Sequence, residues 1–152
     1  MSKTRTSKNS STVMNEVVFP NDTNPVGIVH GGRIVQLMDI ACAICAQLHA
    51  GKIAVTAGID KVSFKQPAKL GDILTIKSHI TRTFTTSMEI HAEVWAMRLP
   101  ELVPFLTNEA YFTFVALDEH ARPTAVSQMK PVTSSEKKQY KEALGRRKSR
   151  LA

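Results

Sequence analysis

The residues best suited to chemistry lie in one short stretch around the start of an apolar segment. Asn24 opens a loop, and Gly31 and Gly32 follow His30 at its end. Asp39 lies about two helical turns further along. The N-terminus of a helix presents free backbone N–H groups and a positive dipole end, and glycine lets a ligand oxygen approach them closely. We therefore predict that two groups face the same small volume. One is a set of N–H donors that polarises a carbonyl, and the other is a carboxylate that acts as a base.

The segment that must position these residues is predicted to be a helix from Arg33 to Ala50. It contains no proline or glycine, and it is rich in Ile, Leu, Ala, Met and Cys. Gly51 is a natural stop for it. Its polar residues share about a third of the helix circumference. A helix that is otherwise apolar must be wrapped, and a curved sheet around it would do so. These polar residues are Arg33, Gln36, Asp39 and Gln47.

The stretch 24–39 reads NPVGIVHGGRIVQLMD. It resembles the hotdog-fold acyl-CoA thioesterases, in the branch of the cytosolic acyl-CoA hydrolases, whose pattern is N-x-x-G-x-x-[FH]-G-G-x-x-x-x-x-M-D. The resemblance extends over residues 13–132. It implies an α+β hotdog fold, in which a curved antiparallel sheet wraps a central helix. It also implies hydrolysis of an acyl-CoA to a free carboxylic acid and coenzyme A, without a metal or organic cofactor, by a homo-oligomer that is a dimer or a trimer of dimers.

The resemblance also assigns roles to the residues of the motif. Asp39 would be the general base that activates water, or else a nucleophile that forms an anhydride with the acyl group. Gly31 and Gly32 would bind the thioester oxygen through their N–H groups. Asn24 would place the water or the thioester across a subunit boundary, although Asn-Pro is also a common opening of a structural turn. His30 would help to position the substrate.

Basic residues are candidates for binding the phosphates of coenzyme A. In the body of the chain, we expect Lys61, Lys65 and Arg82 to fill this role. The segment 136–152 carries seven basic residues and two acidic ones, so it could also fold over the nucleotide. The alternative is that this segment simply docks as a capping helix. A capping box at Thr133–Glu136 predicts such a helix, and Gly145 is expected to end it.

The charge of the chain is concentrated at its ends. The net charge of the chain is +7. Residues 1–12 hold three basic residues and no acidic one, and residues 136–152 hold seven basic residues and two acidic ones. The near-neutral body does not favour a dedicated nucleic-acid-binding domain. We predict a disordered basic tail at 1–12, one domain at 13–132, and a C-terminal helix with a basic tail at 133–152. The N-terminus lacks the apolar region of a secretory signal.

The two cysteines, Cys42 and Cys45, lie inside the predicted helix. Redox pairs prefer a helix N-terminus, and a zinc site would need further ligands. We therefore predict two buried, reduced thiols, which fit a cytoplasmic protein. No run of residues is apolar enough throughout to predict a membrane span.

The second half of the chain predicts an antiparallel sheet. Polar and apolar residues alternate on both sides of a hairpin centred near Thr85. This register places His91 opposite His79, and Glu93 opposite Lys77, on the outer face. Two histidines suggest a metal site, but we expect no further ligands to converge there, so a solvated face with one ion pair is the prediction. The apolar strand 111–117 is predicted to be central or to face a subunit.

Two other functions compete with hydrolysis. A hotdog protein could bind acyl-CoA without catalysis and act as a regulator, with its basic ends contacting nucleic acid or a partner. Against this, Asn24 and Asp39 are both present, and no helix-turn-helix segment is found. A hotdog dehydratase acting on 3-hydroxyacyl thioesters would use a His–Glu or His–Asp pair, which the Met38-Asp39 motif does not fit.

Overall fold

The computed structural model describes residues 4–152. The elements follow one another as one long helix, then four long strands, then a second helix, after a short strand at the start. In chain order they are the 3-10 turn η1 (Ser7–Asn9), β1 (Thr12–Val17), the 3-10 turn η2 (Pro20–Asp22), α1 (Gly31–Ala50), β2 (Ala54–Phe64), β3 (Ile73–Thr83), β4 (Ser87–Met97), β5 (Phe105–Ala116) and α2 (Ser134–Leu151).

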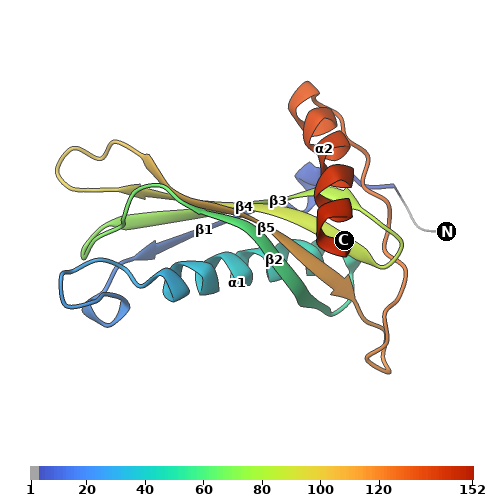
Figure 1. Cartoon of the computed structure of the whole chain (residues 1–152), viewed down its shortest axis with the longest axis horizontal. Coiled ribbons are helices and arrows are strands. Elements are labelled where there is room, and N and C mark those ends of the chain that lie inside the picture. Colours follow the sequence, from blue (N-terminus) through green and yellow to red (C-terminus); the bar gives the residue numbers. More distant parts are fainter. Residues whose placement is uncertain (1–3) are drawn as a thin grey trace.

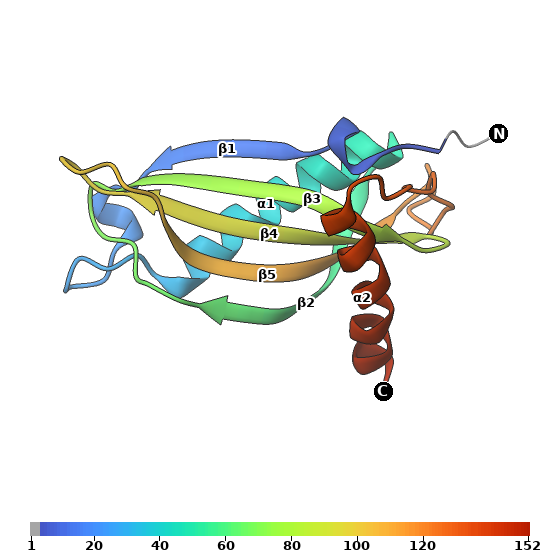
Figure 2. The ribbon, with the colours of Figure 1, turned by 90° about the horizontal axis from the view of Figure 1, so that it is seen from above.

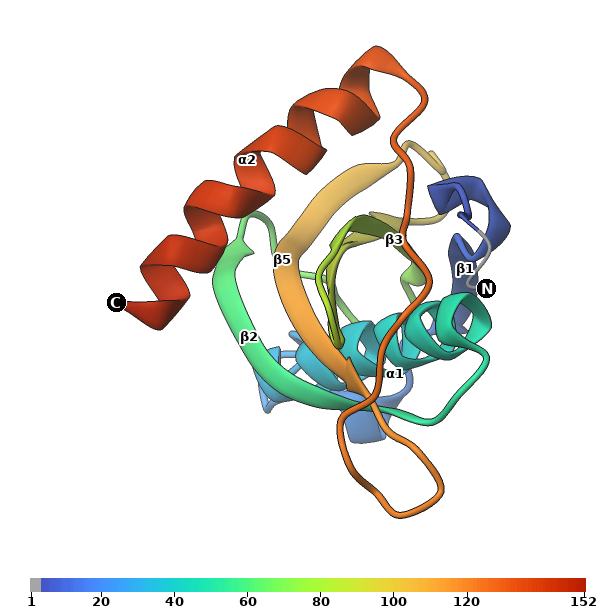
Figure 3. The same ribbon diagram turned by 90° about the vertical axis from the view of Figure 1, so that its right-hand side faces the viewer.

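The five strands form one antiparallel sheet in the order β1-β3-β4-β5-β2. Figure 2 shows this order from above, with α2 crossing one end of the sheet. In the end-on view of Figure 3 the sheet curves around α1, and α2 lies outside the curve. The α+β hotdog fold expected from the sequence is confirmed.

The central helix α1 lies along the concave face of the sheet (Figure 1). Its sheet-facing residues form the core with apolar residues of the strands, such as Ile76, Ile90 and Phe112. By length and mean hydropathy α1 could cross a membrane, contrary to the sequence expectation, but the core helix of a globular protein meets the same test. Gly51 ends α1 in the left-handed conformation, at φ 64°, as predicted. The buried residues of α1 are Ile34, Leu37, Met38, Ala41, Cys42, Cys45, Ala46 and His49.

The predicted hairpin register is confirmed, because His79 pairs with His91 and Lys77 with Glu93. The predicted ion pair is not found, since no salt bridge joins Lys77 and Glu93 among residues 4–152. The outer face is not uniformly solvated either. His91 is only 5% exposed, which the alternation of polar and apolar residues could not show.

The apolar strand β5 is central, between β4 and β2. β2 is one of the two edge strands, with β1 at the other edge, and it leaves several large apolar side chains in solvent. They continue onto the side of α1 that the sheet does not cover. We call this the β2–α1 surface, and it comprises Ile59 and Val62 of β2 with Ile40, Ile44 and Leu48 of α1.

The segment before β1 packs against the fold, so the prediction of a disordered tail is wrong for residues 4–12; residues 1–3 lie outside the described part. Arg5 forms a parallel bridge with Met129. Its Nη1 donates hydrogen bonds to the carbonyls of Leu48 (3.1 Å) and His49 (2.6 Å). These are among the last carbonyls of α1, where a positive charge is favourable. A basic residue that caps a distant helix cannot be recognised from local sequence.

The capping box of α2 is confirmed, because Thr133 Oγ1 accepts a hydrogen bond from the Glu136 amide (3.1 Å). The prediction that Gly145 ends this helix is wrong, since α2 continues to Leu151. The reason lies in the sheet. Arg146 donates to the buried carboxylate of Glu89 on β4 (2.7 Å), and Arg150 reaches the same carboxylate (3.0 Å). These contacts hold the last turns of α2 across the outer face.

We expect Arg146→Ala to lower the free energy of unfolding by about 3 kcal/mol, because it leaves the fully buried Glu89 carboxylate without its main partner. Arg147→Ala is the matched control. Its guanidinium lies half-buried over the Phe84 ring (4.1 Å), so little loss is expected. Urea unfolding of both variants at pH 7 provides the measurement, and equal losses would show that the ion pair does not hold α2.

The same pair predicts acid sensitivity. Burial alone raises the pKa of Glu89, but hydrogen bonds from Arg146 and Thr81 outweigh it and leave that pKa below its ordinary value. A carboxyl with a lowered pKa contributes stability above its unfolded pKa, and this contribution is lost as the pH falls through the folded pKa. The stability difference between wild type and Arg146→Ala should therefore shrink below about pH 4.

Candidate active site

The start of α1 presents unpaired backbone donors. The helix begins at Gly31, and His30 is the residue before it, with no side-chain cap. The His30 amide donates to the carbonyl of Asp22 (2.9 Å), which fixes how the chain enters the helix. Within residues 4–152, the N–H groups of Gly31 and Gly32 have no hydrogen-bond acceptor. Together with the dipole of a twenty-residue helix, they form a site for an oxygen that carries negative charge.

A cleft of about 220 Å³ opens beside this helix start. Gly31 and Phe64 both line it, and a Cβ atom on Gly31 would come within 3.3 Å of the Phe64 ring. Glycine at this position therefore keeps the cleft open, whereas Gly32 has open space around it. Lys65 also lines the cleft, as does the buried Asn108, which the sequence analysis did not identify.

Asn24 organises the loop that leads to the helix. Its Oδ1 accepts hydrogen bonds from the amides of Val26 (3.0 Å) and Ile28 (3.1 Å). Gly27 completes the turn at φ 78°, a conformation that favours glycine. The structural role considered for Asn24 is therefore real. The side-chain nitrogen Nδ2 of Asn24 takes no part in this turn, so it can still donate a hydrogen bond to a ligand.

Asp39 lies half-buried on the side of α1 that faces the edge strand β2. Its Oδ1 accepts a short hydrogen bond from Thr56 Oγ1 (2.6 Å). The bond holds the carboxylate in one orientation and leaves its other oxygen available. Sequence reasoning missed Thr56. The only signal was a hydroxyl side chain in a strand that begins Ala-Val-Thr-Ala-Gly, and this does not indicate a distant carboxylate.

Within one chain, the carboxylate and the helix start do not face the same volume, so that expectation is corrected. Asp39 is eight positions after Gly31 in the helix, which places them about 12 Å apart along the axis. Asp39 does not line the cleft, whose walls include Gly31 and Ile34. One thioester carbon could not lie close to both groups. Asp39 and Thr56 instead lie beside the exposed β2–α1 surface.

The predicted substrate-binding residues divide into two groups. His30 and Lys61 are exposed, and Lys65 lines the cleft, so all three can meet a ligand. Arg82 does not belong with them in this chain. Its Nη1 donates to the Tyr140 carbonyl (2.9 Å) and its guanidinium lies over the Tyr140 ring (3.9 Å), which fixes it against α2.

The basic C-terminal segment is also partly used by the fold. Arg146 and Arg150 bind Glu89, and Arg150 also approaches Asp60 of β2 (3.3 Å). This supports the alternative in which residues 134–151 dock as a helix. Lys137, Lys138, Lys141 and Lys148 stay exposed.

The prediction of two buried, reduced thiols is confirmed, since Cys42 and Cys45 are free and buried. Burial raises the pKa of Cys45 to about 11 and that of Cys42 well above its ordinary value. Both are therefore thiols rather than thiolates at neutral pH, which excludes them as nucleophiles.

Comparison with known proteins gives consistent results. The profile of the Thioesterase superfamily matches residues 26–99. The uncharacterized acyl-CoA thioester hydrolase YkhA of Bacillus subtilis is 34% identical over 134 residues, which cover 88% of this chain and 78% of YkhA. Among solved structures, a hexameric acyl-CoA thioesterase in its apo form superposes with a TM-score of 0.94 at 36% identity, covering 98% of this chain and 96% of that one.

A second solved structure carries ligands. The acyl-CoA hydrolase of Staphylococcus aureus, in complex with butyryl coenzyme A, coenzyme A and coenzyme A disulfide, has a TM-score of 0.90 at 34% identity, with 98% of this chain and 93% of that chain covered. Further structures of that hydrolase contain an asparagine, an aspartate or a threonine replaced by alanine. These three positions have the same spacing along that chain as Asn24, Asp39 and Thr56 have here.

Proposed function

The chain belongs to the thioesterase superfamily, and from this membership we infer that it is an acyl-CoA thioesterase, which hydrolyses an acyl-CoA to a free carboxylic acid and coenzyme A. The observation that carries the proposal is the hydrogen bond between Thr56 and Asp39 (2.6 Å). It holds a carboxylate ready to accept a proton, beside a surface that is open to a ligand.

The proposed reaction needs a base, a water and a site for the oxyanion. Asp39 removes a proton from water as the water oxygen attacks the thioester carbon. The negative charge that develops on the carbonyl oxygen is held by the N–H groups of Gly31 and Gly32. The C–S bond then breaks, and the sulfur leaves as the thiol of coenzyme A after protonation. We propose no cofactor for these steps.

We propose that each site is built from two subunits. The separation of about 12 Å along α1 prevents one chain from supplying both the base and the oxyanion site. The β2–α1 surface flanks Asp39 and Thr56, and its exposed apolar side chains are typical of an interface. Pairing through β2 would bring the Asn24 loop and the helix start of one chain to Asp39 of its partner. A trimer of such dimers would agree with the hexameric relative.

Two further assignments belong to this proposal. Lys65 and Lys61 bind the phosphates of coenzyme A, since Lys65 lines the cleft at the helix start and Lys61 is exposed on the same strand-to-loop segment. The free thiols Cys42 and Cys45 support a location in the reducing cytoplasm.

Thiol release from a panel of acyl-CoAs tests the activity and reports the preferred chain length. Asp39→Asn should lower kcat/KM by about 10²- to 10⁴-fold, because loss of a general base removes transition-state stabilisation. Glu119→Gln removes an exposed carboxylate elsewhere and should have no effect. No thiol release by wild type with any acyl-CoA would contradict the proposed function, and an Asp39→Asn variant with more than about a tenth of wild-type turnover would remove Asp39 from the mechanism.

The role of Thr56 is tested by comparing two substitutions. Thr56→Ala removes the hydroxyl and should lower kcat by about 10- to 100-fold, the equivalent of one hydrogen bond to a charged group. Thr56→Ser keeps the hydroxyl and should retain most activity. If both variants lose the same activity, the hydroxyl is not the reason for the loss.

A composite site predicts complementation. Asn24→Ala and Asp39→Ala are each expected to be inactive as pure proteins. After subunit exchange, half of the dimers are mixed, and each mixed dimer has one intact site, so about a quarter of wild-type activity should return. Labelled subunits should be used to verify exchange by mass spectrometry. No recovery after verified exchange would place each site within one chain.

A further inference from the structure

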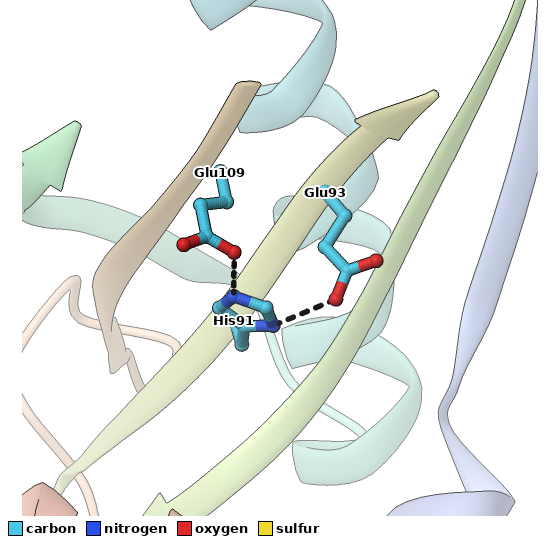
Figure 4. Close-up of side chains that lie close together, drawn as sticks. All are labelled: His91, Glu93 and Glu109. Carbon is cyan, nitrogen blue, oxygen red and sulfur yellow. Dashed lines mark ion pairs between the residues drawn. The ribbon is translucent and has the colours of Figure 1, made fainter. Parts of the chain in front are cut away.

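A second cluster of ligating side chains lies on the convex face of the sheet, on the side away from α1. His91 and Glu93 come from β4, and Glu109 comes from β5 (Figure 4). Glu93 and Glu109 are direct cross-strand partners. Successive side chains of a strand point to opposite faces, so these residues point away from the core, whereas their neighbour Ala92 points into it.

His91 lies between the two carboxylates without a good hydrogen bond to either. Its Nδ1 is 3.6 Å from Glu93 Oε1, and its Nε2 is 3.6 Å from Glu109 Oε2. Hydrogen bonds of this type are about 2.7–3.2 Å long. His91 is only 5% exposed, and within residues 4–152 its buried Nδ1 has no hydrogen-bond partner. A buried, unsatisfied nitrogen is unfavourable unless another group approaches it.

Within residues 4–152, neither carboxylate forms an ion pair with a lysine or an arginine. Like charges directly opposite each other on adjacent strands are destabilising. Lys77 is the strand partner of Glu93, but no ion pair joins them in the described part of the chain. Glu93 instead accepts a hydrogen bond from Trp95 Nε1 (2.7 Å), which orients its other oxygen toward His91. The side chain of Glu109 is 38% exposed, so solvent and ions reach the cluster.

We propose that His91, Glu93 and Glu109 bind a divalent cation of the Zn²⁺ type on the convex face. One donor atom from each residue lies within 4.8 Å of the other two. Donors about 2.1 Å from a tetrahedral zinc lie about 3.4 Å apart, so small side-chain movements complete the site, with water as the fourth ligand. The two separations of 3.6 Å involve different ring nitrogens of His91. Only one of these nitrogens can bind the ion, so the carboxylate beside the other nitrogen must move toward the ion.

The chemistry of the neighbours agrees with this assignment. Burial, and then the charge of the nearby His79, lower the pKa of His91, although Glu93 and Glu109 act in the opposite direction. The neutral imidazole is the form that binds a metal. His79 is not a ligand, because its Nε2 lies 2.8 Å from Gln139 Oε1 of α2. The prediction that no further ligands converge here is wrong, because Glu109 comes from a strand whose pairing the sequence did not reveal.

The bound ion would neutralise two opposed carboxylates and link β4 to β5. It would not take part in thioester hydrolysis, since Asp39 and Gly31 belong to α1 on the other face of the sheet. The proposal is therefore independent of the proposed function. Chelator-treated protein should keep its thioesterase activity while it loses the metal.

The test is calorimetric titration of chelator-treated full-length protein with ZnCl₂. Wild type should bind one Zn²⁺ per chain, and Glu109→Gln and His91→Gln should each weaken binding at least about tenfold. His120→Gln is the matched control. His120 lies 3.9 Å from Glu119 in an exposed loop, so zinc bound there without specificity would be lost in this variant and retained in the other two.

A second measurement covers the case in which His91→Gln does not fold. Glu109→Gln removes a charge from a partly exposed side chain, so without metal its melting temperature should equal or exceed that of wild type. Saturating Zn²⁺ should raise the melting temperature of wild type and not that of Glu109→Gln. The proposal is overturned if wild type binds no Zn²⁺ at millimolar concentration, or if binding and thermal shift survive Glu109→Gln unchanged.

Discussion

The constraint on which the rest of the structure depends is the enclosure of one highly apolar helix. The apolar side chains of α1 are buried only if a sheet covers most of the helix circumference, and an antiparallel sheet can do so because it curves. The single strip that the sheet leaves uncovered lies next to the edge strand β2. Asp39 is on this strip, and Thr56 is on the strand beside it. The requirement for burial therefore decides where a polar, reactive side chain of this helix can be placed.

The same constraint explains why the proposed oxyanion site and the proposed base are separated. A helix offers free backbone N–H groups only in its first turn. In α1 this turn lies beside the cleft that the loop after Asn24 and Phe64 form. A carboxylate fixed by a strand must lie along the helix body, where the strand runs beside it. One straight helix cannot bring these two places together. Self-association through the uncovered strip is the simplest way to bring them together, and it also covers the exposed apolar residues of β2.

The sequence contained most of the fold, because its signals are local and periodic. The C-terminal end of α1, the hairpin register that pairs His79 with His91, and the capping box at Thr133 all follow from spacing or cap chemistry, whereas α1 starts at Gly31, two residues before the predicted start. The failures share a physical cause, which is a partner that is distant in the chain. Gly145 does not end α2, because Arg146 and Arg150 find Glu89 beyond it. The role of Thr56 depends on the contact of β2 with α1, and that of Glu109 on the pairing of β5 with β4. The motif named Asp39 and Gly31 as candidates, and their spacing already places them two helical turns apart, but it did not reveal that Thr56 binds Asp39.

The hydrogen bonds of Arg5 have a consequence for the order in which the chain acquires its structure. Its amide donates to the Gln128 carbonyl (3.0 Å) and its carbonyl accepts from the Lys130 amide (2.8 Å). Arg5 thus binds residues that are synthesised only after the last strand, β5. Until then the backbone of Arg5 lacks these two partners, and the C-terminal end of α1 relies on its local cap at Gly51. The closure of Arg5 onto the loop at Gln128–Lys130 therefore follows synthesis of the sheet.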